Sequence, residues 1–158
     1  MFSMVRVDNR LIHGQVVEAW LPHLKAERVI VADDEAAGSP LVRAAMGLAV
    51  NPSIEVIIQP LKSLDYEALS RDTRRTLLLV RDISGIAEAQ AKGLLLTHVN
   101  LGNVHFATGR RQISPSVFLS PDELNQLKML SDSGIQVEAR AVPNERALSF
   151  DEMKQKLQ

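Results

Sequence analysis

The sequence predicts an α/β protein built on an open, mainly parallel, twisted sheet of about seven strands with helices on both faces. Short apolar or β-branched runs alternate with longer amphipathic segments about seven times along the chain. Buried strands joined by helices are typical of parallel sheets covered on both sides. The 158 residues, 46% hydrophobic and 23% charged, have the size and composition of one packed domain, 1–158.

The first half of the chain is expected to supply four strands. The first covers about Ser3–Asp8, and a helix follows His13 until Pro22 stops or bends it. Ser39 as N-cap and Pro40 at the first helical position predict another helix, with an inner face of Leu41, Val42, Ala45, Met46 and Ala49. The other elements are strands at Arg28–Ala32, Ile54–Ile58 and Thr76–Val80 and a short helix at Leu61–Leu69.

The second half continues the alternation. Two capping boxes, Ser120–Glu123 and Ser149–Glu152, each predict the start of a helix, and the first of these helices ends at Gly134. The segment 111–119 is extended but broken by Pro115, so we expect it at a sheet edge. The other elements are a helix at Ile83–Lys92 closed by Gly93 and strands at His98–Gly102 and Ile135–Val142.

Composition excludes several classes of function. The net charge of −1 gives no electrostatic footprint for nucleic acid. The absence of cysteine removes disulfides and thiolate chemistry. No apolar run approaches the ~20 residues that span a bilayer, and no basic segment precedes an apolar one at the N-terminus. We therefore expect a cytoplasmic protein without direct membrane insertion.

The stretch "VRVDNRLIHGQVV", residues 5–17, places a histidine where the first strand gives way to a helix. The free N–H groups and positive dipole end of a helix N-terminus favour an anion, phosphate above all. Gly14 lets the backbone approach a bound group, and Arg10 offers a planar fork of donors. Histidine has an ordinary pKa of about 6.5, so a neutral nucleophilic nitrogen is available near pH 7. The stretch thus predicts phosphoryl transfer through His13.

Other interpretations of these residues stay open. His13 alone in a loop is also compatible with a structural, hydrogen-bonding role. Arg6 is expected to point to solvent or to a carboxylate, and Trp20 to pack in the core. Asp33, Asp34 and Glu35 suit either a divalent cation or, more simply, a helix N-terminus and an arginine partner. The four histidines lack metal-ligand spacing, so no metal or other cofactor is expected.

The chain resembles enzyme IIB of the mannose/fructose/sorbose family of the bacterial phosphoenolpyruvate-dependent sugar phosphotransferase system. "VRVDNRLIHGQVVEAW" is similar to the opening segment of that family, and the Arg-Leu-Ile-His-Gly-Gln core is highly specific. "VIVADDEAAGSPLVRAAM", "VNLGN" and "GIQVEARAVPNE" are similar to its acidic loop, its Asn-x-Gly-Gly loop and its closing strand. Asn9 stands where many relatives have a second aspartate, and Asn103 where many have glycine.

The resemblance implies that His13 is transiently phosphorylated on Nδ1. The phosphoryl group would come from a phosphohistidine on a IIA partner and pass to a sugar held by membrane IIC/IID partners, a protein-N(pi)-phosphohistidine–sugar phosphotransferase activity. Carried over by position, the active-site loop consists of Asp8, Asn9, Arg10, Gly14 and Gln15. More distant support is expected from Arg6, Asp34 and Gly102.

Two questions stay open at this point. A regulatory phosphoprotein would use the same His13 without sugar uptake, and a non-catalytic α/β ligand-binding module would carry no phosphate. Leu11 and Ile12 either dock partners on an exposed loop or anchor the loop onto the sheet.

Overall fold

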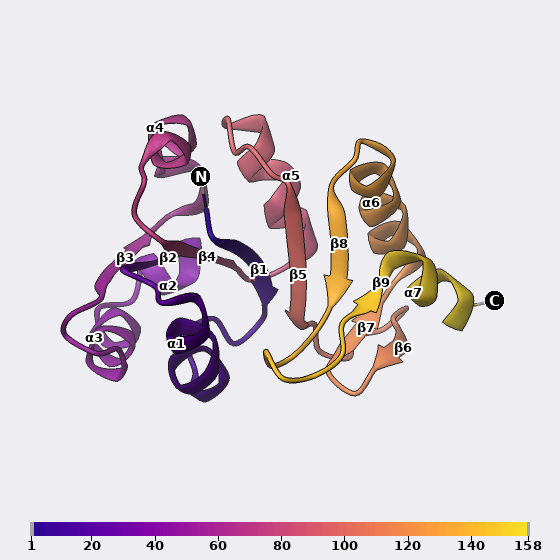
Figure 1. The fold of residues 1–158 in the computed structure, drawn as a ribbon, viewed down its shortest axis with the longest axis horizontal. Helices are drawn as coiled ribbons and strands as arrows, with labels where there is room; N and C mark the ends of the chain where they lie inside the picture. The colour runs from indigo at the N-terminus through magenta and orange to yellow at the C-terminus, as the bar shows by residue number, and fades with distance from the viewer. Residues whose placement is uncertain (1, 158) are drawn as a thin grey trace.

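The computed structural model describes residues 2–157 and contains a seven-stranded sheet in the order β3-β2-β4-β1-β5-β8-β9 (Figure 1). Six of these strands are parallel, and β9 pairs antiparallel with β8. The strands are β1 Met4–Asp8, β2 Arg28–Ala32, β3 Glu55–Gln59, β4 Thr76–Val80, β5 His98–Asn103, β8 Gln136–Ala139 and β9 Leu148–Ser149. The predicted open, mainly parallel sheet is confirmed.

Helices cover both faces of this sheet. The first face packs against the 3-10 helix η2 and against α4 to α7, and the second against the π-helix η1 and against α1 to α3. The helices are η1 Val16–Trp20, α1 Leu21–Leu24, α2 Asp34–Ala37, α3 Pro40–Ala49, η2 Leu61–Ser63, α4 Tyr66–Arg71, α5 Ile83–Ala91, α6 Pro121–Asp132 and α7 Phe150–Lys156. No helix among residues 2–157 is long and apolar enough to cross a membrane.

β1 lies at the point where the strand order reverses. The chain leaves β1 toward β2 on one side, and after β4 it crosses to β5 on the other side of β1. Ligands of open parallel sheets bind outside the carboxyl ends of the strands at such a switch point. The loop that follows β1, which carries His13, therefore occupies the binding position of the fold.

Successive side chains of β1 alternate between the two faces of the sheet. Val5 and Val7 belong to the core on the α5 and α6 side, whereas Met4 belongs to the core on the η1 and α3 side. The same alternation directs Arg6 and Asp8 toward η1. Two charged side chains are thereby buried beneath the helix that follows His13.

Several local predictions need correction. Pro22 does not end the first helix, which continues to Leu24 and closes at Lys25 in the left-handed region, with φ of 50°. The π-helical turn Val16–Trp20 directly precedes this stretch, and the α-helical register resumes next to the proline, which has no N–H to donate. Leu41 is 80% exposed, so α3 packs inward through Val42 and Met46 only.

Three segments differ in extent or pairing. The expected helix Leu61–Leu69 is split into η2 and α4, because Asp65 caps a new helix at Tyr66. Segment 111–119 does not lie at the sheet edge: β6 Arg111–Ser114 and β7 Val117–Leu119 form a separate antiparallel hairpin with Pro115 in its turn. β8 is shorter than the predicted Ile135–Val142 because the chain turns away after Ala139.

Candidate functional site

Asp8 is the centre of a hydrogen-bond network at the carboxyl end of β1. Its Oδ1 accepts the backbone N–H of Arg10 at 2.9 Å. Its Oδ2 accepts three hydrogen bonds, from Arg6 Nε at 3.1 Å, from Asn103 Nδ2 at 3.0 Å and from His13 Nε2 at 2.8 Å. Burial by itself raises the pKa of Asp8, but the hydrogen bond from His13, the charge of Arg6 and the hydrogen bond from Asn103 outweigh it and leave the pKa below its ordinary value. Asp8 is therefore an ionised carboxylate, which accepts hydrogen bonds but cannot donate them.

The contact with Asp8 determines the tautomer of His13. Because the carboxylate has no proton to give, Nε2 must carry the ring proton, and the neutral imidazole has its lone pair on Nδ1. Nδ1 is buried and has no hydrogen-bond partner within residues 2–157. A buried nitrogen of this kind is an unused acceptor, which is costly unless a ligand engages it.

The His13 side chain is only 8% exposed. Asp8 holds the ring against the sheet, and Nδ1 is covered. The ring nevertheless forms part of the wall of a shallow hollow of about 420 Å³, together with Arg10, Gly14, Gln15, Glu18, Ala19 and Val142.

The start of the helix supplies donors beside this hollow. The helical turn begins at Gly14, and the carbonyl of His13 accepts the N–H groups of Val16 and Val17, both at 3.0 Å. The first N–H groups of a helix have no acceptor inside it. No hydrogen bond occupies the Arg10 guanidinium within the described part of the chain, and Arg10 is exposed. A guanidinium and a helix N-terminus thus flank His13, as an anion requires.

Arg6 supports Asp8 from below and is 0% exposed. Its guanidinium donates to Asn100 Oδ1 at 2.8 Å and to the carbonyls of Arg140 and Ala141 at 3.1 and 3.0 Å. It also lies 5.3 Å from the centre of the Trp20 ring, a cation–π distance. Of the two orientations expected for Arg6, the structure shows the one toward a carboxylate.

Gly102 explains how such a large side chain fits. A Cβ at this position would lie 2.0 Å from Cζ of Arg6. The glycine of the "VNLGN" stretch therefore makes room for the guanidinium. Trp20 is buried as expected, and its Nε1 donates to the carbonyl of Ala141 at 2.8 Å.

Asn103 belongs to the site although the sequence did not single it out as a functional residue. Its Nδ2 donates to Asp8 Oδ2 and, at 2.9 Å, to Gln15 Oε1. The signals available in the sequence were the position of Asn103 directly after Gly102, at the end of a strand, and its place where many members of the resembled family have glycine.

The remaining predicted residues lie in different surroundings. The N–H of Asn9 donates to the carbonyl of Asn103 at 2.9 Å, so Asn9 ties the loop to β5. Asp34 is not in contact with the His13 loop; its Oδ1 accepts the N–H of Leu61 at 2.8 Å. Leu11 and Ile12 are 1% and 8% exposed and belong to the core beneath η1, so they anchor the loop.

The acidic loop after β2 serves a helix and an arginine, the simpler of its two interpretations. Asp33 caps α2 through the N–H of Ala36. It also accepts two hydrogen bonds from Arg81, at 3.0 and 2.7 Å. Within residues 2–157 no group of three or more histidine, aspartate or glutamate side chains is arranged to hold a metal ion.

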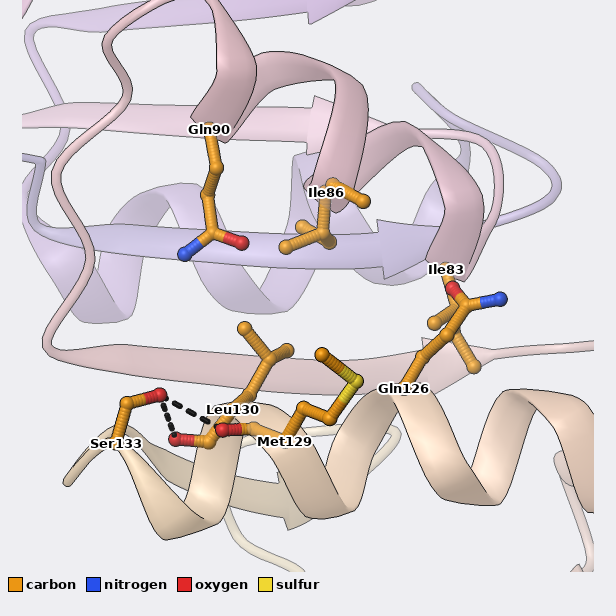
Figure 2. A pocket seen from close by; sticks show the side chains of 8 residues that line it. Ile83, Ile86, Gln90, Gln126, Met129, Leu130 and Ser133 are labelled. Atoms are coloured by element: carbon orange, nitrogen blue, oxygen red, sulfur yellow. Dashed lines mark hydrogen bonds between the residues drawn. The ribbon is translucent and has the colours of Figure 1, made fainter.

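A second hollow, of about 220 Å³, lies between α5 and α6 on the opposite face of the sheet. Figure 2 shows Ile83, Ile86 and Gln90 of α5 facing Gln126, Met129 and Leu130 of α6. The Ser133 hydroxyl at its end donates to carbonyls of its own helix, at 2.7 and 3.0 Å. No titratable side chain lines this hollow. This hollow therefore supplies no titratable acid or base to a reaction.

The fold and the site together define a class of protein: an open parallel α/β domain with one oriented histidine on the loop at its switch point. Residues 2–158 match the family described as "PTS system sorbose subfamily IIB component", and the chain belongs to this family.

Individual relatives agree with this assignment. The N-acetylgalactosamine-specific phosphotransferase enzyme IIB component 2 of Escherichia coli K12 is 30% identical over 146 residues, which cover 92% of this chain and 93% of the relative. The mannose-specific EIIAB component of the same organism is 25% identical over 159 residues, 99% of this chain but 49% of the relative. The crystal structure of the IIBSor domain of the sorbose permease from Klebsiella pneumoniae superposes with a TM-score of 0.86 at 21% identity, over 98% of this chain and 97% of that domain, and shows the same fold.

Proposed function

We propose that this protein is a phosphohistidine carrier of sugar uptake, which accepts a phosphoryl group on His13 Nδ1 from a IIA protein and passes it to a sugar held by IIC/IID partners. The hydrogen bond of 2.8 Å between His13 Nε2 and Asp8 Oδ2 carries this proposal, because it leaves the lone pair on Nδ1. Family membership supports a transferase role of this kind.

The geometry accounts for both transfers. In the first, Nδ1 attacks phosphorus, and the P–N bond of the donor phosphohistidine breaks. Nε2 keeps its proton, and the Asp8 carboxylate stabilises the positive charge that the ring then acquires. Arg10 and the N–H groups at the start of the helix are placed to hold the phosphoryl oxygens. In the second transfer a sugar hydroxyl attacks phosphorus, the P–N electron pair returns to Nδ1, and the hydroxyl proton passes to this freed nitrogen and then to solvent.

The covered Nδ1 adds a requirement. An atom without solvent-accessible surface cannot meet phosphorus in line, so the wall of the hollow has to open when the donor docks. Gln15 and Val142 line the hollow with His13 and come from different parts of the chain. Displacement of Val142 by a donor would expose the nucleophile and leave the Gln15 amide beside it.

The names of the relatives support the type of partner but not one sugar. The mannose-specific relative is an EIIAB component, and this chain spans about half of it, which is consistent with a IIA unit acting on a IIB unit. The two relatives named above are specific for N-acetylgalactosamine and mannose. We accordingly propose a hexose or amino sugar as the final acceptor and the cytoplasm as the place of transfer.

Phosphorylation in a reconstituted system tests the proposal. The protein is incubated with phosphoenolpyruvate, the general phosphotransferase proteins and a cognate IIA, and its intact mass is measured. We expect an acid-labile, base-stable gain of one phosphate that is absent from His13→Gln and kept by His105→Gln, a variant at an exposed histidine. A label retained by His13→Gln would disprove the assignment. Transfer of the label to sugar by IIC/IID vesicles separates uptake from a purely regulatory role.

A further inference from the structure

Asn103 connects three elements that meet at the site. It is the last residue of β5, and its single amide nitrogen donates both to Asp8 Oδ2, at 3.0 Å, and to Gln15 Oε1, at 2.9 Å. Asp8 ends β1, and Gln15 lies in the first turn of the helix after His13. Of the side chains that donate to Asp8 Oδ2, the one that also contacts this helical turn is Asn103.

The chemistry of Asp8 fixes the direction of every hydrogen bond along this line. A carboxylate can only accept hydrogen bonds, so Asn103 has to direct its NH₂ group toward Asp8. The second hydrogen of that NH₂ group is donated to Gln15, which must accept it with its carbonyl oxygen. The amide of Gln15 therefore turns its own NH₂ group away from Asn103. Gln15 lines the hollow beside His13, and no acceptor within residues 2–157 takes a hydrogen bond from its Nε2.

We propose that Asn103 is a positioning residue for phosphoryl transfer: it holds Asp8 against His13 Nε2 and orients the Gln15 amide so that a donor faces the hollow beside Nδ1. This inference rests on the proposed function, since the group to be received is a phosphoryl group. Asn103 itself does not touch that group. It acts through Asp8 on the tautomer of the nucleophile and through Gln15 on the lining of the hollow.

Two variants of Asn103 separate orientation from shape. Asn103→Ala removes both hydrogen bonds. Asn103→Asp has nearly the same shape but, as a carboxylate, donates to neither Asp8 nor Gln15 and adds a negative charge beside Asp8. A merely structural role predicts that both variants lower the melting temperature but leave the ring tautomer and the maximal rate unchanged, whereas a positioning role predicts that these two readouts change. Asn125→Ala, at an exposed position on α6, is the matched control.

The test uses two measurements on the full-length protein. The ¹⁵N chemical shifts of the His13 ring report its tautomer without any phosphoryl donor. The rate of phosphorylation by phosphoramidate, a small donor that needs no docking surface, is followed by intact mass over a range of donor concentrations. We expect a single Nε2–H tautomer in the wild type and in Asn125→Ala, and a mixture in Asn103→Ala. The maximal rate should fall at least about tenfold in Asn103→Ala, which loses both hydrogen bonds, and also fall in Asn103→Asp.

Each outcome supports or overturns the inference. An unchanged tautomer and an unchanged maximal rate in both variants would overturn it, even if the melting temperature fell. If wild-type His13 takes no phosphoryl group from any donor, the proposed function fails, while the ring tautomer still decides the role of Asn103 toward Asp8.

Discussion

At the scale of single residues, the site combines one charged network with one strained turn. Leu11 has a φ of 58°, in the left-handed region that non-glycine residues seldom adopt. Its side chain is nevertheless 1% exposed in the core beneath η1. The N–H of Leu11 donates to the carbonyl of Asp8 at 3.0 Å, which closes the turn. Burial of the leucine thus holds a tight turn that returns His13 to Asp8.

Replacement of Leu11 by alanine should destabilise the fold. The change removes a buried side chain, and we expect the free energy of unfolding to fall by about 2–5 kcal/mol in urea denaturation. Leu41→Ala, at a leucine that is 80% exposed, is the control and should stay within about 0.5 kcal/mol of the wild type. Unchanged stability with a higher KM for phosphorylated IIA would instead show that Leu11 serves docking.

At the scale of secondary-structure elements, the strands and helix starts that depend only on nearby residues were predicted correctly from the sequence. The strands at Arg28–Ala32 and Thr76–Val80 are apolar runs bounded by turns, and both have the predicted bounds. The capping boxes at Ser120 and Ser149 formed as predicted, because each joins residues three positions apart. The two-residue strand β9 and the four-residue helix α2 were missed, since neither is long enough to show a period.

The parts of the site that depend on distant partners could not be predicted in this way. His13, Asp8 and Arg10 lie within one short stretch: the chemistry of that stretch pointed to His13 and Arg10, and the resemblance added Asp8. The burial of Arg6 depends on Asn100 of β5 and on the carbonyls of Arg140 and Ala141, which follow β8. The residues next to Arg6 in the sequence do not show that these distant groups accept hydrogen bonds from its guanidinium. The burial of His13 Nδ1 likewise depends on residues that come together only when the chain is folded.

The contact between β1 and β5 gives a prediction for Gly102. In Gly102→Ala the new Cβ would overlap the Arg6 guanidinium, which cannot retreat without losing its bonds to Asp8 and Asn100. We expect a loss of at least about 2 kcal/mol in the free energy of unfolding, and slower phosphorylation of His13. Gly47→Ala in α3 is the matched control, because its Cβ would meet open space. That variant should be more stable by about 0.5–1 kcal/mol. Equal stability of the two variants would contradict the packing of Arg6 over Gly102.

At the scale of the whole molecule, two buried carboxylates belong to one polar network that joins three strands of the sheet. Glu138 of β8 accepts from Asn100 at 3.1 Å and pairs with His98 at 3.2 Å. Asn100 contacts Arg6, and Arg6 contacts Asp8, so the polar network runs from β8 through β5 to β1. Networks of this kind stabilise a fold only while every member keeps its partner. The protonation of one carboxylate therefore affects the packing of the other two strands.

This network predicts how stability depends on acid. Burial raises the pKa of both Asp8 and Glu138, but hydrogen bonds and positive neighbours outweigh it, and each pKa lies below its ordinary value of 3.8 or 4.5. As the pH falls, the unfolded chain binds these protons at a higher pH than the folded chain does. The stabilisation is therefore fully present above about pH 4.5 and is lost as the pH falls through the lowered pKa values of the folded state. Urea unfolding followed by the fluorescence of buried Trp20 between pH 2 and 7 measures this slope.

The slope should be shallower in Asp8→Asn and in Glu138→Gln than in the wild type, because each variant removes one carboxylate that must be protonated. Asp8→Asn should also be less stable at pH 7, by about 3–5 kcal/mol, since it leaves the buried Arg6 charge without its partner. Asp122→Asn, at an exposed carboxylate, should keep the wild-type slope. A wild-type slope in all three variants would mean that acid acts elsewhere and that the three strands are not linked through these charges.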